Sequence, residues 1–159
     1  MITLERRSIR FRELLSQLQQ NYSESYLSLI GRKISALEAK ETTPIFNDTL
    51  LDIALSSIQL ITTRQGVPFQ SVIDRMFEIQ DKKGRDYGED VDGLRNLRRR
   101  GQYGVIARMG DKLSRLESLC KPGREAAVTD ESVEDTALDL ANYCLLLIIL
   151  REDEAGMYP

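Results

Sequence analysis

The sequence predicts an all-α protein, a bundle of about six helices that forms a single domain over residues 1–159. Apolar residues recur every three or four positions through most of the chain, which is the spacing of one face of a helix. No segment alternates apolar and polar residues in the manner of a half-buried strand. The length suits one domain, and 42% apolar with 30% charged residues is a globular composition rather than a disordered one.

Six apolar stripes give the predicted helices. In chain order, the stripes lie at residues 11–18, 26–37, 51–61, 69–77, 113–119 and 130–151. Pro68 suits the start of the fourth helix, and the Pro122-Gly123 pair ends the fifth. The sixth helix is predicted to begin near Thr129 or Asp130, since both are good N-caps, and to run to about Arg151.

Glycine is concentrated in one segment, because six of the ten glycines fall between Gly84 and Gly110. Glycine is a poor helix former, so we expect a glycine-rich loop or a broken helix near residues 84–104. The same region is basic, and we interpret the three arginines at 98–100 as a solvated basic segment. The last predicted helix is acidic and the sequence pI is 5.2, which together argue against a nucleic-acid-binding protein.

The chain contains an internal sequence repeat, with units at approximately residues 9–64 and 75–151. Residues 30–39 match residues 109–118 at five of ten positions, and residues 47–54 match residues 134–141 at five of eight. The blocks keep their order while the connecting segments change length, so we expect a duplication with pseudo-twofold symmetry.

The second unit carries the fuller polar set. Arg115 stands where the first unit has Ala36, and Asn142 stands where it has Leu55. We therefore expect the chemistry in the second unit. A composite site stays open, in which the acids of the second unit face two acids of the first: Asp48 and Asp52.

The composition excludes several kinds of active site. The chain has no histidine, so it holds no Ser-His-Asp or Cys-His nucleophile system and no histidine-ligated metal. Its two cysteines cannot form a four-thiolate zinc site or a disulfide framework. Catalysis would use carboxylates, Lys, Arg, Tyr and a hard metal ion, Mg²⁺ or Mn²⁺, which takes oxygen ligands.

We expect a soluble, cytoplasmic protein with no membrane partner. The N-terminal residues are charged and lack the apolar region of a signal peptide. The longest nearly uncharged apolar stretch, residues 140–150, is roughly half of what a membrane span needs. Whether the protein forms a homo-oligomer stays open.

An acidic stripe runs along the last predicted helix. Glu131, Asp135 and Asp139 are spaced four residues apart, and Asn142 follows three residues later. Four residues make slightly more than one turn, so these side chains share a face of an otherwise apolar helix. Two interpretations stay open. The stripe chelates Mg²⁺ for a phosphate substrate, or the early acids complement the helix N-terminus and Asp139 meets an arginine.

Lys112 and Arg115 are three residues apart, so they share a face of the preceding helix. Antiparallel packing of the last two helices would bring that face toward the acidic stripe. There the two cations would bind a polyphosphate, or they would form interhelical salt bridges. Further upstream, Tyr87 follows Asp86 at a glycine-flanked turn, where its ring would stack on a nucleobase or serve packing.

Together these residues resemble a known family. The elements that carry the resemblance are Lys83-x-x-Asp86-Tyr87-Gly88, Asn96, Lys112-x-x-Arg115-Leu116 and Glu131-x-x-x-Asp135-x-x-x-Asp139-x-x-Asn142-Tyr143. They are similar to the nucleotide-modification-associated all-α family of phages and bacteria, some of whose members look like tandem copies of one unit. That family is grouped with the MazG-like nucleoside triphosphate pyrophosphatases.

The resemblance implies a Mg²⁺- or Mn²⁺-dependent hydrolase of the cytoplasm, or of the host cytoplasm for a phage protein. It would cleave an NTP or dNTP to the monophosphate and pyrophosphate. The implied metal ligands are Glu131, Asp135 and Asp139, and the implied catalytic residues are Glu134, Lys112 and Arg115. Glu78 stays open as an alternative to Glu134 for the general base. The implied substrate-binding residues are Lys83, Asp86, Tyr87, Asn96 and Asn142. The alternative is a non-catalytic nucleotide-binding protein on the same scaffold, a sensor or a sequestering factor.

Overall fold

The computed structural model describes residues 2–18, 26–39, 46–86, 94–121 and 132–158. Within these ranges it contains six α-helices and no β-strand, so the predicted all-α bundle is confirmed. The helices are α1 (Leu4–Leu18), α2 (Tyr26–Glu38), α3 (Phe46–Gln65), α4 (Phe69–Asp86), α5 (Arg95–Leu119) and α6 (Val133–Glu154). None of the helices in these ranges is both long enough and apolar enough to cross a membrane.

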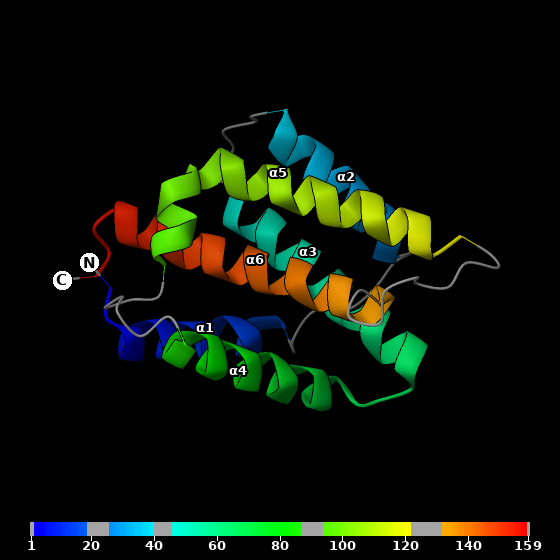
Figure 1. The fold of residues 1–159 in the computed structure, drawn as a ribbon, viewed down its shortest axis with the longest axis horizontal. Helices are drawn as coiled ribbons and strands as arrows, with labels where there is room; N and C mark the ends of the chain where they lie inside the picture. The colour runs from blue at the N-terminus through cyan, green and yellow to red at the C-terminus, as the bar shows by residue number, and fades with distance from the viewer. Residues whose placement is uncertain (1, 19–25, 40–45, 87–93, 122–131, 159) are drawn as a thin grey trace.

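α6 lies at the centre of the bundle (Figure 1). α3 packs along α6, while α5 and α2 lie on one side of it and α1 and α4 run beside each other on the other. From Ala137 to Leu150, α6 is buried at almost every position. A helix that is apolar around its whole circumference must be covered on all sides, which explains its central position.

The two halves of the bundle, α1–α3 and α4–α6, share several packing relationships, although α1 packs against α3 while the described residues of α4 and α6 show no comparable packing. α2 packs against α3 as α5 packs against α6, and α3 contacts α4 as α6 contacts α1. The equivalent helices α2 and α5 also meet, as do α3 and α6. This is the pattern that a pseudo-twofold axis between the halves would produce. The duplication itself stays a prediction.

The glycine-rich segment is helical over most of its described length. α4 continues to Asp86 and α5 begins at Arg95, and residues 87–93 lie outside the described ranges. Gly101 interrupts α5 with φ 65° and ψ 171°. This backbone conformation is essentially restricted to glycine. Residues 95–104 therefore form a broken helix rather than a loop.

α6 begins later than the sequence predicts. Its N-cap is Ser132, whose Oγ accepts a hydrogen bond from the Asp135 N–H at 3.1 Å. The predicted caps, Thr129 and Asp130, lie outside the described ranges. The Ser132 hydroxyl also donates to Asp135 Oδ2 at 2.6 Å. The cap therefore positions the side chain of a predicted metal ligand.

A clasp joins α1 to the end of α6. Arg10 donates from Nε and Nη2 to the two carboxylate oxygens of Glu152, at 2.9 and 2.6 Å, and the Tyr158 hydroxyl also donates to Glu152. The Ile2 N–H donates to Asp153 Oδ1 at 2.6 Å. Burial alone would raise the pKa of Glu152, but the hydrogen bonds from Arg10 and Tyr158 lower it below its ordinary value. These contacts hold α1 against the last turns of α6.

Candidate functional site

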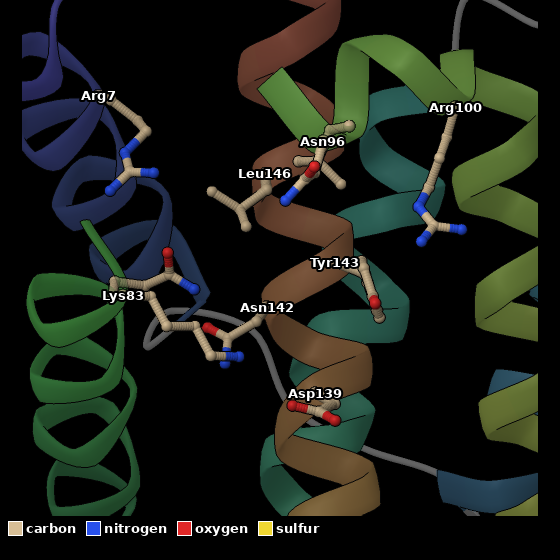
Figure 2. Close-up of a pocket in the computed structure, with 10 residues that line it drawn as sticks. Arg7, Lys83, Asn96, Arg100, Asp139, Asn142, Tyr143 and Leu146 are labelled. Atoms are coloured by element: carbon tan, nitrogen blue, oxygen red, sulfur yellow. The ribbon is translucent and has the colours of Figure 1, made fainter. Parts of the chain in front are cut away.

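A cavity of about 350 Å³ lies between α1, α4, the first turns of α5 and the middle of α6 (Figure 2). Four residues that the sequence singled out line this cavity: Lys83, Asn96, Asp139 and Asn142. They come from three helices that are separate along the chain, so the fold brings them together. The volume lies within the range of small-molecule binding sites.

The cavity lining also includes polar side chains that are not among the predicted site residues, namely Arg7, Gln80, Arg100 and Tyr143. Arg7 and Gln80 are buried, with 5% and 8% of their surface exposed. Each falls on the apolar stripe of its helix, Arg7 four residues before Phe11 and Gln80 four residues after Met76. A polar residue at a position where the helix stripe is otherwise apolar is the sequence signal that could have identified Arg7 and Gln80 as site residues. Arg100 was interpreted as solvated; it is exposed, and it also lines the cavity.

The cavity lining carries more positive than negative charge. Arg7, Lys83 and Arg100 contribute three cations, while Asp139 is the single acid among the described residues that line it. A cleft lined mainly by one sign of charge attracts ligands of the opposite sign. Guanidinium and ammonium groups are the common protein partners of phosphate, so the lining suits a phosphorylated ligand.

Asn142 is a buried amide at the wall of the cavity. Only 4% of it is exposed, and neither Oδ1 nor Nδ2 has a hydrogen-bond partner among the described residues. Figure 2 shows this amide pointing from α6 into the space toward Lys83 on α4. Buried polar groups are nearly always paired, because an unpaired one destabilises the folded state by about 1–3 kcal/mol. At Asn142 a ligand or a water molecule that enters the cavity would supply the missing partner.

The described acids near the start of α6 are held by cations from three other helices. Lys112 Nζ of α5 lies 2.9 Å from Asp139 Oδ2. Arg75 Nη2 of α4 lies 2.7 Å from Asp135 Oδ1. Arg64 Nε of α3 lies 3.1 Å from Glu134 Oε1. The Lys112–Asp139 pair shows that the α5 face carrying Lys112 does approach the acidic stripe.

The other predicted site residues lie away from this cavity or outside the residues that the structure describes. Arg115 is half-buried on α5, one turn beyond Lys112, and does not line the cavity. Asp86 is the last residue of α4, and its side chain is outside the description. Tyr87 and Glu131 fall outside the described ranges. Their roles stay predictions.

The described acids fit a magnesium ion only together with a phosphorylated ligand. No three His, Cys, Asp or Glu side chains within the described ranges are grouped so that they could hold a metal ion. Asp135 and Asp139 supply two carboxylates one helical turn apart. Mg²⁺ is commonly held by one or two carboxylates, with substrate phosphates and waters as the remaining ligands. Both carboxylates now engage a cation, which would have to exchange for the metal.

The acids of the first half do not face those of the second. α3 and α6 are antiparallel, because Arg64 near the end of α3 pairs with Glu134 at the start of α6, and Arg151 near the end of α6 lies 3.7 Å from the centre of the Phe46 ring. At ~1.5 Å per residue, this register separates the predicted acids of α3 from those of α6 by about 10 Å or more along the axes. The packing therefore favours a site whose acids come from the second half alone.

A comparison with protein-family models, curated proteins and solved structures finds no match for the chain. The class of the protein is defined by its fold and cavity: an all-α bundle with a cationic, amide-lined cavity in which most of the lining comes from the second half.

Proposed function

We propose that the protein binds a nucleoside triphosphate, ribo or deoxy, in this cavity and hydrolyses it to the monophosphate and pyrophosphate with Mg²⁺. The observation that supports this most is the cavity lining, where four helices contribute three cations together with a buried, unpaired amide. Cations match phosphate groups, and a neutral amide matches the polar atoms of a base or sugar. A nucleotide carries both kinds of group.

The cations assigned to the substrate phosphates lie in two places, inside the cavity and at its edge. Lys83 and Arg100 line the cavity and would bind the phosphates of the substrate. Lys112 already reaches Asp139 at the cavity wall, and Arg115 lies one turn further along α5. From there they would offset the negative charge that develops on the phosphates during hydrolysis, since preorganised cations stabilise such charge best.

The acids at the start of α6 would supply the metal site and the base. Asp135 and Asp139 would hold Mg²⁺, with Glu131 as the third predicted ligand. A bound Mg²⁺ polarises phosphoryl oxygens and activates water. Glu134 would accept the proton of the attacking water after exchange with its present partner, Arg64.

A second candidate function is nucleotide binding without catalysis. It is favoured by a specific observation: Asp135 and Asp139 are each engaged by a cation, and no three-acid group occurs in the described ranges. A protein that only binds a nucleotide needs the cationic lining and the amide but no metal site. It would act as a sensor or a sequestering factor.

Pyrophosphate release tests the proposal. The protein is incubated with each common NTP and dNTP in Mg²⁺, and in EDTA as the metal-free control. We expect at least one nucleotide to yield its monophosphate and pyrophosphate only when Mg²⁺ is present. Binding by calorimetry without release from any nucleotide would favour the non-catalytic candidate. Neither binding nor release would contradict both.

Asp139→Asn and Asp52→Asn form a matched pair of variants. Each aspartate is paired with a lysine of a neighbouring helix, at 2.9 and 3.0 Å, but Asp139 lines the cavity and Asp52 does not. Asp139→Asn should lower turnover by about a hundredfold or more, because it removes charge from the reacting centre. Asp52→Asn should leave turnover close to wild type. Circular dichroism checks that both variants are folded.

A further inference from the structure

The cavity is polar in two different ways. Lys83 and Arg100 are exposed cations, whereas two of the buried side chains that line it, Gln80 and Asn142, are neutral amides. The third cation, Arg7, is buried and already has an interaction partner. A ligand that fills the cavity would thus place charged atoms toward solvent and uncharged polar atoms toward the inside. The phosphates and the base of a nucleotide are two such ends.

Packing alone does not require an amide at position 142. In the first half of the chain the aligned residue is Leu55, which is buried with 8% exposure. Leucine and asparagine have the same branched shape, so an apolar side chain suits this place in the bundle. An unpaired amide there destabilises the free protein. Residues that lower stability in this way are often retained for function.

We infer that Asn142 recognises the hydrogen-bonding edge of a nucleobase, which enters the cavity with its phosphates toward Lys83 and Arg100. The inference rests on the proposed function in that the ligand is a nucleotide, but it does not depend on hydrolysis. Asn142 offers a donor, Nδ2, and an acceptor, Oδ1, side by side. Nucleobase edges offer a complementary acceptor and donor side by side. A phosphate offers acceptors only and would leave Oδ1 unpaired.

Gln80 provides the second buried amide of the same cavity, and it comes from α4, the helix that also carries Lys83. Two amides from different helices can pair with more than one polar atom of a planar ring. The competing explanation for Asn142 is a trapped water molecule that pairs with its amide. The two explanations predict opposite effects of replacing Asn142 by an apolar residue.

The test compares wild type with Asn142→Leu and with the control Gln59→Leu. Gln59 is also a buried amide with an unpaired atom, Oε1, but it lies on α3 and does not line the cavity. The Kd of each nucleoside triphosphate and of tripolyphosphate is measured by calorimetry in EDTA, where no metal-dependent turnover interferes. Tm is measured by thermal unfolding.

For the wild type we expect at least one nucleoside triphosphate to bind about tenfold or more tightly than tripolyphosphate. In Asn142→Leu this preference should disappear while tripolyphosphate binding is kept, and Tm should rise by about 3 °C because an unpaired amide is removed. Gln59→Leu should keep the preference for the nucleotide.

Equal affinity of the wild type for nucleotides and tripolyphosphate, or no binding of either, would overturn the inference. So would an Asn142→Leu variant with a lowered Tm and an unchanged preference, which is the result that a trapped water predicts. A base-dependent preference that Asn142→Leu abolishes, without pyrophosphate release by the wild type, would uphold the inference and overturn the hydrolase.

Discussion

Lys33 and Lys112 hold equivalent places in the two halves of the bundle, since each forms an ion pair with an aspartate of the following helix. The Nζ–Oδ2 distances are 3.0 Å to Asp52 and 2.9 Å to Asp139. These four residues are aligned in the sequence repeat. Their surroundings differ, because Asp139 lines the cavity and Asp52 does not. One half of the protein thus serves as an internal control for the other.

Lys112→Met should weaken triphosphate binding by about tenfold, and monophosphate binding less, because Lys112 is assigned to the phosphate tail. Lys33→Met should leave both triphosphate binding and monophosphate binding unchanged. Both ion pairs are partly exposed and contribute only about 0–1 kcal/mol to stability, so both variants should unfold close to wild type. Calorimetry gives the Kd values. Equal losses for the two ligands, or equal effects of the two variants, would assign Lys112 a structural role.

Gly101→Ala should destabilise the protein by roughly 1–3 kcal/mol, because φ 65° with ψ 171° is strained for a residue with a Cβ. Gly31→Ala is the control: Gly31 lies inside α2, and a Cβ there meets no atom within 4 Å. That substitution should stabilise by about 0.5–1 kcal/mol. Urea unfolding measures both. A change of the same sign in the free energy of unfolding for both variants would contradict the interpretation that the backbone at position 101 is strained for alanine.

The Glu152 clasp should weaken in acid. The folded-state pKa of Glu152 lies below the ordinary 4.5, since hydrogen bonds from Arg10 and Tyr158 outweigh the opposing effect of burial. A carboxyl with a lowered folded-state pKa contributes stability that is fully present above its unfolded-state pKa. This contribution is lost as the pH falls through the folded-state pKa. The loss should therefore begin below about pH 4.5.

Urea unfolding of wild type and Glu152→Gln between pH 7 and pH 3 measures this contribution. The variant should be less stable than wild type at pH 7, and the difference should shrink below about pH 4.5, where the wild-type carboxyl becomes protonated. A difference that stays constant with pH would show that Glu152 does not titrate in this way.

The helices were predictable because an apolar stripe is a property of neighbouring residues. The stripe at 51–61 lies within α3, and the fifth stripe ends with α5 at Leu119. The first residue of α6 was not predictable, because several residues that can cap a helix precede it. The hydrogen bond from the Asp135 N–H to Ser132 Oγ decides among them. Such a choice depends on where the helix packs, which the local sequence does not state.

The site was predictable only where it lies on neighbouring helices. The approach of Lys112 to Asp139 followed from antiparallel packing of two consecutive helices. Arg7 belongs to the other end of the chain, and its place in the cavity depends on how α1 packs against α6. The same holds for the ion pair of Arg75 with Asp135, which no local pattern encodes.

The clasp between Arg10 and Glu152 spans 142 residues of sequence. During translation, α1 is therefore made on the order of ten seconds before its partner exists, at the usual rates of chain elongation. Until then the clasp cannot form, and α1 can pack only against α3, α4 and the earlier turns of α6. Nascent chains that stop short of Glu152 should consequently bind ligand in this cavity more weakly than chains that include it, because the wall that contains Arg7 is held less firmly.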